Sequence, residues 1–353
     1  MLRQPRLIKP LLALTFTLSA AVTSAAEPFK VCWSIYAGWM PWGYAADKKI
    51  IDKWAKKYDI EIEIVQINDY IESINQYTAG QFDGCAMTNM DALTIPAAGG
   101  VDTTALIVGD FSNGNDGIVL KGANKTLKDI KGQNVNLVEL SVSHYLLARG
   151  LETVGLKESD IKVVNTSDAD MVAVYGTKDV TAVTTWNPLL NEILTLPNNT
   201  QVFDSSQIPG EIMDLMVVNT DTLKKNPALG KALVGAWYEI MGVMSGSDKA
   251  ATDAKTSMAV ASGTDLAGYN AQLSTTKMFY TPQSALALAN SDELLKTMQK
   301  VAEFSFDHGL LGEGAPDAEY IGVEGPKGVY GNTDNVKLRF DTTYMQMAAD
   351  KKL

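Results

Sequence analysis

The sequence contains only two histidines, His144 and His308, and only two cysteines, Cys32 and Cys85, in 353 residues. It has no HExxH, GxSxG, CxxC or Walker motif, and neither cysteine neighbours a histidine along the chain. Histidine and cysteine are the usual ligands of zinc and the usual partners in activated nucleophiles. The sequence therefore indicates no catalytic centre, and we expect neither a metal site nor a cofactor.

One arrangement resembles a nucleophile beside a base. Ser141, Ser143 and His144 lie together at the start of a predicted helix. Serine is a preferred capping residue at a helix start. We interpret the serines as caps and the histidine as a packed or ligand-bonding residue.

No segment after residue 26 approaches the ~20 apolar residues that a membrane-spanning helix needs. At the N-terminus, three cations (Arg3, Arg6 and Lys9) precede a short apolar run, and Ser24-Ala25-Ala26 follows it. This order is typical of a secretory signal peptide. We expect cleavage near Ala26 and a soluble, exported mature chain.

The chain also lacks excess positive charge. Its formal net charge is −11, and loss of the cationic leader makes it more negative. This charge excludes a nucleic-acid partner. Cys32 and Cys85 lie in apolar, strand-like runs and allow one disulfide in an oxidising compartment. Two buried thiols are an equal alternative, because neighbouring parallel strands give poor disulfide geometry.

Strand and helix patterns alternate from residue 29 onwards, which predicts an α/β fold with mostly parallel sheets. A polar, glycine-rich segment at 109–117 separates two runs of this alternation, and a second crossing is predicted at 210–219. Both crossings indicate two lobes joined by hinges. The expected division is a signal peptide at 1–26, one lobe from 27–112 and 218–353, and a second lobe from 113–217.

The predicted elements follow in chain order. Strands are expected at 29–35, 60–67, 83–88, 104–108, 118–120, 134–137, 161–165, 180–184 and 214–219. Helices are expected at 45–58, from 70 to 80, at 92–98, within 227–261, at 265–274 and 282–308, and at 344–349.

An unusual aromatic stretch, Tyr36-Ala37-Gly38-Trp39-Met40-Pro41-Trp42-Gly43-Tyr44, follows the first strand. Ligands of open α/β sheets bind at the carboxyl ends of strands. Polar and aromatic residues at such ends form the candidate binding site: Trp39, Trp42, Asn89, Asp91, Asp116, Glu139, Ser141, His144, Trp186 and Glu211.

Other acids stand near these positions, namely Asp168, Asp170 and Asp214. Several acids have structural alternatives: Asp91, Asp168 and Asp170 as helix caps, Asp116 as a turn residue, and Glu211 as a solvated loop charge. No lysine or arginine stands on these turns. Carboxylates and indole faces suit a small cation with N–H donors, whereas an anion would want basic groups.

Four segments resemble landmarks of the periplasmic solute-binding proteins of the nitrate, sulfonate and taurine class. They are residues 36–42, Gly80-Gln81-Phe82-Asp83-Gly84, residues 96–102 and residues 179–188. The resemblance runs from about residue 29 to residue 237. It implies a two-lobed, type II periplasmic binding protein without enzyme activity.

Three further segments resemble a subfamily of that class: residues 67–70, 87–91 and 110–117. Its members serve transporters encoded beside urea-carboxylase-type enzymes, which are associated with guanidine degradation. The resemblance implies a monomer in nitrogen uptake that binds guanidinium, or a urea- or amidine-like solute, and delivers it to an ABC permease and its ATPase.

Two rival functions remain open. One is a binding protein for a small anion such as a sulfonate, taurine or nitrate, held at the helix start at 141–145. The other is an enzyme, because the same fold hosts pyrimidine-forming proteins of thiamine synthesis. Those proteins are cytosolic, and the expected signal peptide argues against this alternative.

Overall fold

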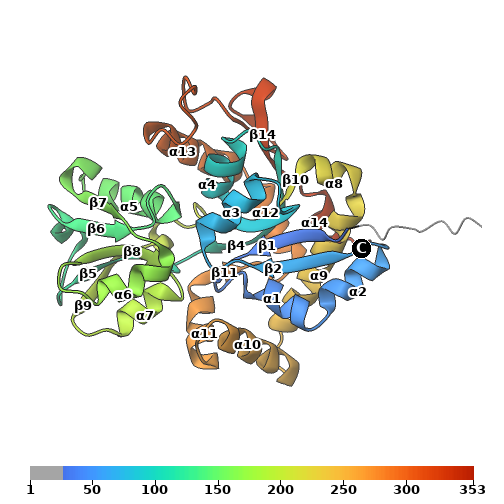
Figure 1. Cartoon of the computed structure of the whole chain (residues 1–353), viewed down its shortest axis with the longest axis horizontal. Coiled ribbons are helices and arrows are strands. Elements are labelled where there is room, and N and C mark those ends of the chain that lie inside the picture. Colours follow the sequence, from blue (N-terminus) through green and yellow to red (C-terminus); the bar gives the residue numbers. More distant parts are fainter. Residues whose placement is uncertain (1–26) are drawn as a thin grey trace, which may run out of the picture.

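The computed structural model of the protein describes residues 27–353, so the expected signal peptide lies outside the described residues. The chain forms two α/β lobes, each built on its own sheet, as Figure 1 shows with the smaller lobe on the left. The fold class expected from the sequence is confirmed, but both sheets are mixed rather than mostly parallel.

The larger lobe contains a nine-stranded sheet in the order β13-β12-β14-β4-β10-β3-β1-β2, with β11 paired to β4. Its strands are β1 (Phe29–Trp33), β2 (Ile62–Gln66), β3 (Gly84–Thr88), β4 (Thr103–Ser112), β10 (Met213–Asn219), β11 (Thr276–Met278), β12 (Gly322–Gly325), β13 (Gly328–Tyr330) and β14 (Val336–Phe340).

The smaller lobe contains a five-stranded sheet in the order β7-β6-β8-β5-β9. Its strands are β5 (Asp116–Lys121), β6 (Asn134–Leu137), β7 (Lys162–Asn165), β8 (Ala182–Trp186) and β9 (Asn199–Asp204). Its helices are α5 (Val142–Thr153), α6 (Met171–Tyr175) and α7 (Leu189–Thr195).

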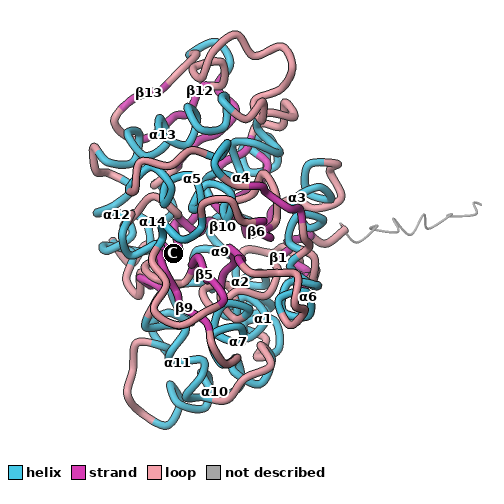
Figure 2. Tube along the Cα trace, turned by 90° about the vertical axis from the view of Figure 1, so that its left-hand side faces the viewer, coloured by secondary structure: helices cyan, strands magenta, loops and turns pink. Residues whose placement is uncertain are grey.

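The remaining helices belong to the larger lobe. They are α1 (Met40–Asp47), α2 (Ile50–Lys57), α3 (Tyr70–Thr78), α4 (Asn89–Ala92), α8 (Thr220–Lys225), α9 (Pro227–Met244), α10 (Lys249–Ala261), α11 (Leu266–Ser274), α12 (Pro282–Ala289), α13 (Glu293–Asp307) and α14 (Thr343–Ala349). Figure 2 shows α13 with β12 and β13 at one end of the molecule, and α10 and α11 at the other.

The helix expected at 45–58 is two helices. The first begins earlier, at Met40, because Pro41 occupies the first helical turn, where its missing N–H is no loss. Lys49 has a left-handed backbone (φ 60°), which ends one helix and starts the next. The pattern at 282–308 likewise splits into α12 and α13.

Two short segments connect the lobes, one between β4 and β5 and one between β9 and β10. Strand β10 returns antiparallel between β3 and β4, which places it at the centre of the larger sheet. This antiparallel return is one reason why the sheets are mixed. Sequence reasoning missed β9, β11 and the three tail strands β12, β13 and β14, of which β14 pairs with β4.

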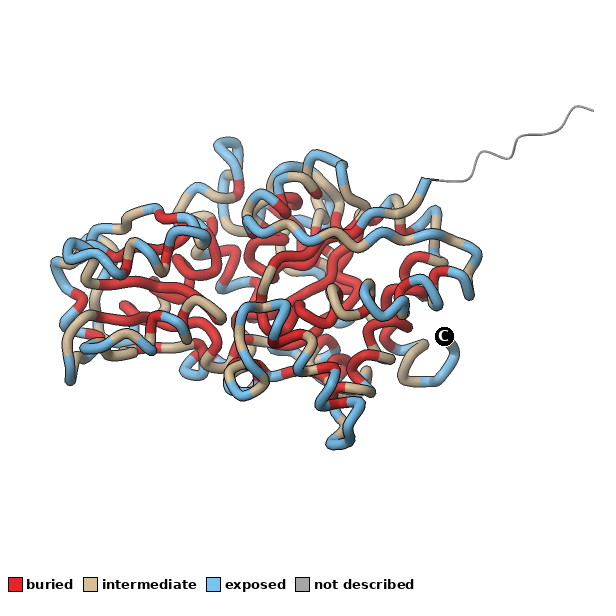
Figure 3. The backbone as a smooth tube through the Cα atoms, turned by 60° about the horizontal axis from the view of Figure 1, so that its bottom comes forward, coloured by how far each residue is buried: buried red, intermediate tan, exposed pale blue. Residues whose placement is uncertain are grey.

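Both sheets are buried, as the red segments of Figure 3 show, and most of their buried residues are apolar. Cys32 on β1 and Cys85 on β3 lie opposite each other and form a disulfide, which decides between the two alternatives. Within residues 27–353, none of the helices has both the length and the apolar character that a membrane crossing requires.

Candidate functional site

A small cavity lies where the two lobes meet. Its volume is about 20 Å³, counted as the space that the centre of a water-sized sphere can occupy. On the same measure, one water molecule needs ~10–15 Å³. The cavity therefore suits a solute of few heavy atoms. Both lobes contribute to its lining: Tyr36, Trp39, Tyr70, Thr88, Asp116, Val142, Trp186, Ile212 and Asp214.

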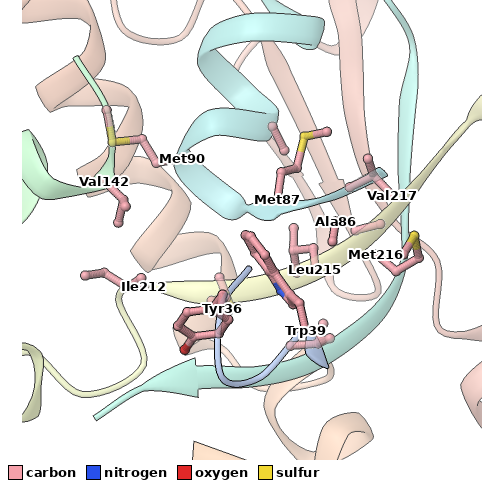
Figure 4. Packing of buried hydrophobic residues seen from close by; sticks show 14 of the residues in the cluster. Tyr36, Trp39, Ala86, Met87, Met90, Val142, Ile212, Leu215, Met216 and Val217 are labelled. Carbon is pink, nitrogen blue, oxygen red and sulfur yellow. The ribbon is translucent and has the colours of Figure 1, made fainter. Parts of the chain in front are cut away.

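Aromatic rings form most of the wall. Trp39 lies between Tyr36 and Tyr70, with ring centroids 5.0 and 5.5 Å away. Trp186 of the smaller lobe meets Tyr70 of the larger lobe edge to face at 5.8 Å. In Figure 4, Val142 and Ile212 lie to the left of Tyr36 and Trp39. The wall is therefore closed by side chains from both lobes.

The local sequence explains how these rings reach the cavity. Tyr36 and Trp39 stand on the turn between β1 and α1. Tyr70 is the first residue of α3, because Asp69 caps that helix by accepting a hydrogen bond from the Glu72 amide. Trp186 ends β8, directly opposite Asp116 in the antiparallel pair of β8 and β5.

Four aspartates gather at or behind the cavity wall: Asp91, Asp110, Asp116 and Asp214. Each is at most 3% exposed. Strand register brings them together, because Asp214 on β10 lies opposite Asp110 on β4 and Thr88 on β3. Asp91 lies three residues beyond Thr88, in the first turn of α4.

Hydroxyl groups are the main hydrogen-bond donors to these acids. Tyr70 and Thr88 donate to Oδ2 of Asp91 at 2.5 and 2.8 Å. Tyr36 donates to Oδ1 of Asp110 at 3.2 Å, and Ser112 donates to Oδ2 of Asp116 at 2.5 Å.

Three buried carboxyl oxygens have no hydrogen-bond partner among the described residues: Oδ1 of Asp91, Oδ2 of Asp110 and Oδ2 of Asp214. No lysine or arginine lines the cavity, and none of the four aspartates has an ion-pair partner within residues 27–353. Buried acceptors without partners are costly. A proton shared between Asp110 and Asp214 satisfies that pair when no ligand is bound, and Oδ1 of Asp91 still lacks a donor.

Burial controls the ionisation of these acids. It raises the pKa of Asp91 to about 6 and the pKa values of Asp110 and Asp116 to about 7. Burial and the adjacent charge of Asp110 raise the pKa of Asp214 well above its ordinary value. The site therefore holds protons at neutral pH that a bound cation would displace.

Gly38 allows the aromatic turn to approach the acids. A Cβ atom at this position would lie 2.4 Å from Oδ2 of Asp110, well inside contact distance. The turn between β1 and α1 thus requires glycine here because of close approach rather than backbone freedom.

Among the residues predicted from the sequence, Trp39, Asp116 and Trp186 line the cavity. Asp91 lies one shell further out, bonded to the lining residues Tyr70 and Thr88. Thr88 also caps α4 by accepting a hydrogen bond from the Asp91 amide, so a capping contact and a site contact coincide here.

Four other predicted residues lie elsewhere. Trp42 stacks on Trp237 in the core at 5.0 Å. The Asn89 side chain accepts from the amide of Met213 and donates to the Glu211 carbonyl, which fixes the start of β10. Ser141 caps α5. Glu139 is exposed to solvent.

The last two predicted residues, His144 and Glu211, belong to contacts beside α13. Glu211 accepts from Tyr145, Arg149 and Lys300. His144 lies near Glu158 and His308, and these three side chains place their ligand atoms within 4.8 Å of one another. Sequence reasoning did not foresee this grouping, because its members are far apart along the chain.

Sequence reasoning also left out several cavity residues. It noted Asp214 at a crossing without including it in the site, and it treated Asp110 and Tyr36 only as parts of motifs. Tyr70 and Thr88 likewise appeared only within the segments 67–70 and 87–91. The signal that could have found Asp110 and Asp214 is a charged residue inside an otherwise apolar strand, which rarely occurs without a function.

Known structures share this fold. The alkanesulfonate-binding protein SsuA from Xanthomonas axonopodis pv. citri superposes with a TM-score of 0.66 at 17% identity, over 82% of this chain and 96% of that one. The nitrate-binding protein NrtA from Synechocystis PCC 6803 gives 0.65 at 13% identity, over 92% and 88%. The chain therefore has the two-lobed fold of periplasmic binding proteins.

Sequence relatives match over a shorter stretch of the chain. A binding protein of Brucella abortus (strain 2308), whose name gives no ligand, is 23% identical over 155 residues, or 42% of this chain and 46% of that protein. The taurine-binding periplasmic protein of Escherichia coli (strain K12) is 23% identical over 144 residues, 40% of this chain and 44% of that protein. The matched region thus spans less than half the length of these relatives.

The sequence pattern described as NMT1/THI5 like matches residues 44–241, which is more than half of the chain. This stretch runs from α1 to α9 and includes both lobe crossings. The chain therefore belongs to the NMT1/THI5-like family.

Proposed function

We propose that this protein is the solute-binding component of an ABC importer and that it captures a small planar cation in the interlobe cavity. Guanidinium fits best, and a urea- or amidine-like solute is the nearest variant. The shared fold with binding proteins for sulfonate and nitrate supports the general role. The identity of the ligand rests on the cavity alone.

The observation that carries the proposal is the set of buried aspartates without a basic partner. Asp116 and Asp214 line the cavity, and Asp91 and Asp110 stand directly behind lining residues. A cation between them would satisfy the unpartnered oxygens and offset the cost of burying carboxylates. An anion would meet these acids without a compensating charge.

Guanidinium matches the remaining features of the site. It is planar, permanently charged and carries N–H donors in a fork that pairs with carboxylates. The rings of Trp39, Tyr70 and Trp186 offer faces and edges to a flat cation. The small volume of the cavity leaves little room for substituents on the nitrogens.

We propose that the lobes close over the ligand by bending at the crossings within 109–117 and 210–219, with lobe boundaries at 27–112 with 218–353 and at 113–217. Hinged closure of two lobes is a common response to ligand binding. The closed monomer would then present the ligand to a permease and its ATPase in the periplasm.

Two alternatives compete. The relatives named for taurine, alkanesulfonate and nitrate favour an anion, but within the described residues no basic side chain lines the cavity. An enzyme of the thiamine-pyrimidine type shares the family pattern. His144, the residue considered for such chemistry, is absent from the cavity lining.

The proposal is tested by thermal shift of the mature protein with guanidinium, urea, methylguanidine, arginine, taurine and nitrate. A ligand at ~100 times its dissociation constant adds ~2.7 kcal/mol to stability. We expect a response to guanidinium below 1 mM. A response only to taurine or nitrate would refute the cation assignment, and turnover that requires His144 would favour the enzyme.

Asp91→Asn and Glu139→Gln form a matched pair of variants for this test. Each removes one negative charge, but Asp91 is buried beside the cavity wall and Glu139 is exposed. Loss of a carboxylate in direct contact with a buried cation costs ~2–5 kcal/mol of binding. Asp91 stands behind Tyr70 and Thr88, so we expect a smaller loss for Asp91→Asn and no loss for Glu139→Gln.

A further inference from the structure

A second contact joins the lobes at one side of the cavity. There the last turns of α13, in the larger lobe, pack against the start of α5, in the smaller lobe. The ring of Phe304 lies 5.3 Å from Tyr145 and 5.8 Å from His144. We call His144, Glu158, Phe304 and His308 the interlobe clasp.

His308 lies between two hydrogen-bond acceptors, the backbone carbonyl of Phe304 and the carboxylate of Glu158. Its Nδ1 lies 2.7 Å from the Phe304 carbonyl oxygen, and its Nε2 lies 2.8 Å from Oε1 of Glu158. A carbonyl and a carboxylate have no proton to give, so both ring nitrogens must carry one. The contact therefore requires His308 as an imidazolium.

His144 has the opposite arrangement. Its Nδ1 accepts a hydrogen bond from the Leu140 amide at 3.2 Å, so in the neutral ring the proton is on Nε2. That Nε2 points to the same Glu158 oxygen at 3.3 Å. The spacing of the three side chains would suit a metal ion, but an Nε2 that carries a proton cannot coordinate one. Protons rather than a metal account for the clasp.

The surrounding charges agree with this assignment. Burial opposes the charge on Glu158, but the hydrogen bond from His308 and the proximity of His144 outweigh it and lower the pKa of Glu158 to about 2. The hydrogen bond to Glu158 raises the pKa of His308, and Asp307 adds to the effect.

Other charged groups surround the interlobe clasp, on each of the elements that pack against it. Arg149 is engaged with Glu211 and Glu152, and Lys300 with Glu211. The remaining charged residues around the clasp are Glu303 on α13 and Lys157, which precedes Glu158 in the chain.

We propose that the clasp is a proton-operated contact, which holds the two lobes together while His308 is protonated and weakens when His308 loses its proton. A neutral His308 keeps one proton, which the Glu158 carboxylate holds on Nε2, so the Phe304 carbonyl then faces a lone pair of Nδ1. The contact between the lobes falls from a charged pair to a single hydrogen bond and weakens at this side. The proposal does not depend on which ligand the cavity binds.

The sign of the effect follows from linkage. The pKa of His308 is raised in the closed state and is ordinarily ~6.5 in the open state. The protonated ring therefore stabilises closure fully at a pH below the open-state pKa. This stabilisation is lost as the pH rises through the closed-state pKa. Each unit of difference makes closure ~10-fold more favourable at acidic than at alkaline pH.

Nitrogen-15 spectra of the ligand-free mature protein test the proton assignment, because the chain has only two histidines. We expect one ring to carry protons on both nitrogens at pH 7. His308→Gln should remove the doubly protonated ring. A neutral His308 at pH 7 would overturn the proposal. So would a shift of both Nε2 signals with one equivalent of Zn²⁺, which would indicate a metal site.

Small-angle X-ray scattering tests the mechanical consequence. The radius of gyration of ligand-free protein should increase between pH 6 and pH 9, and this increase should disappear in both His308→Gln and Glu158→Gln. Lys296→Gln is the matched control, because it removes an exposed ion pair with Glu293 on the same helix. An unchanged radius in the wild type, or an unchanged pH response in His308→Gln, would refute the clasp.

Discussion

Ligand affinity should depend on pH through the buried aspartates of the cavity. Burial raises the pKa of Asp116 to about 7, and a bound cation needs that carboxyl ionised. About 10% of such a group is ionised at pH 6 and about 90% at pH 8. The dissociation constant of guanidinium should therefore fall about tenfold over this range. It should fall up to ~100-fold if Asp110, also near 7, must ionise as well.

Titration calorimetry measures both the affinity and the protons released. Binding at pH 7 in phosphate and in Tris should give different apparent enthalpies, because the released protons are taken up by buffers with different ionisation enthalpies. Asp116→Asn should weaken the pH dependence, whereas His308→Gln should steepen it, since the clasp favours closure at acidic pH and so opposes the effect of the aspartates. An affinity that is constant between pH 6 and pH 8, or stronger at acidic pH, would refute the role of the aspartates.

Four further outcomes are expected. Asp116→Asn should raise the melting temperature of ligand-free protein at pH 8 but not at pH 4, because a buried acid with a raised pKa destabilises the fold as the pH rises from ~4 to about 7. The change in the free energy of unfolding is a few kcal/mol at most. Equal melting curves of variant and wild type at pH 8 would contradict this expectation. Glu211→Gln should lower the free energy of unfolding in urea by about 2 kcal/mol at pH 7. Burial opposes the charge of Glu211, but Arg149, Lys300 and Tyr145 lower its pKa to about 2. The wild type should lose this stabilisation as the pH falls from ~4.3 towards 2. Trp39→Leu should abolish binding with the fold intact, whereas Trp42→Leu should cost about 2–4 kcal/mol of stability and spare binding, and the reverse result would exchange their roles. Reduction of the disulfide, which closes a loop with a separation of 53 residues, should lower the unfolding free energy by up to ~4 kcal/mol, and an unchanged denaturation midpoint with dithiothreitol would argue against it.

Local patterns in the sequence were sufficient to predict the larger features of the fold. The alternation of strands and helices predicted α/β architecture, and the strands at 29–35, 60–67 and 83–88 all formed. The tail could not be predicted in the same way. Its short strands β12 and β13 have little amphipathic pattern, and they are stabilised by pairing with strands that are distant in the sequence.

The site was predicted only in part for a similar reason. Trp39 and Asp116 were found because they stand at an aromatic turn and at a strand start. Asp110 and Asp214 lie within strands, and only the register of β10 against β4 brings them together. The sequence pattern of a strand does not state its partner, so the acidic character of the cavity was underestimated.

The walls and the charges of the cavity stand on different parts of the chain. The rings come from the turn after β1, the start of α3 and the end of β8, whereas Asp110, Asp116 and Asp214 stand on β4, β5 and β10. A substitution at Asp116 or Asp214 would thus change the charge preference of the cavity, whereas Asp110 also accepts the hydrogen bond that holds Tyr36 of the aromatic wall. Ligand shape and ligand charge can therefore be redesigned separately. Asp214, which lines the cavity from β10, is the first position to change.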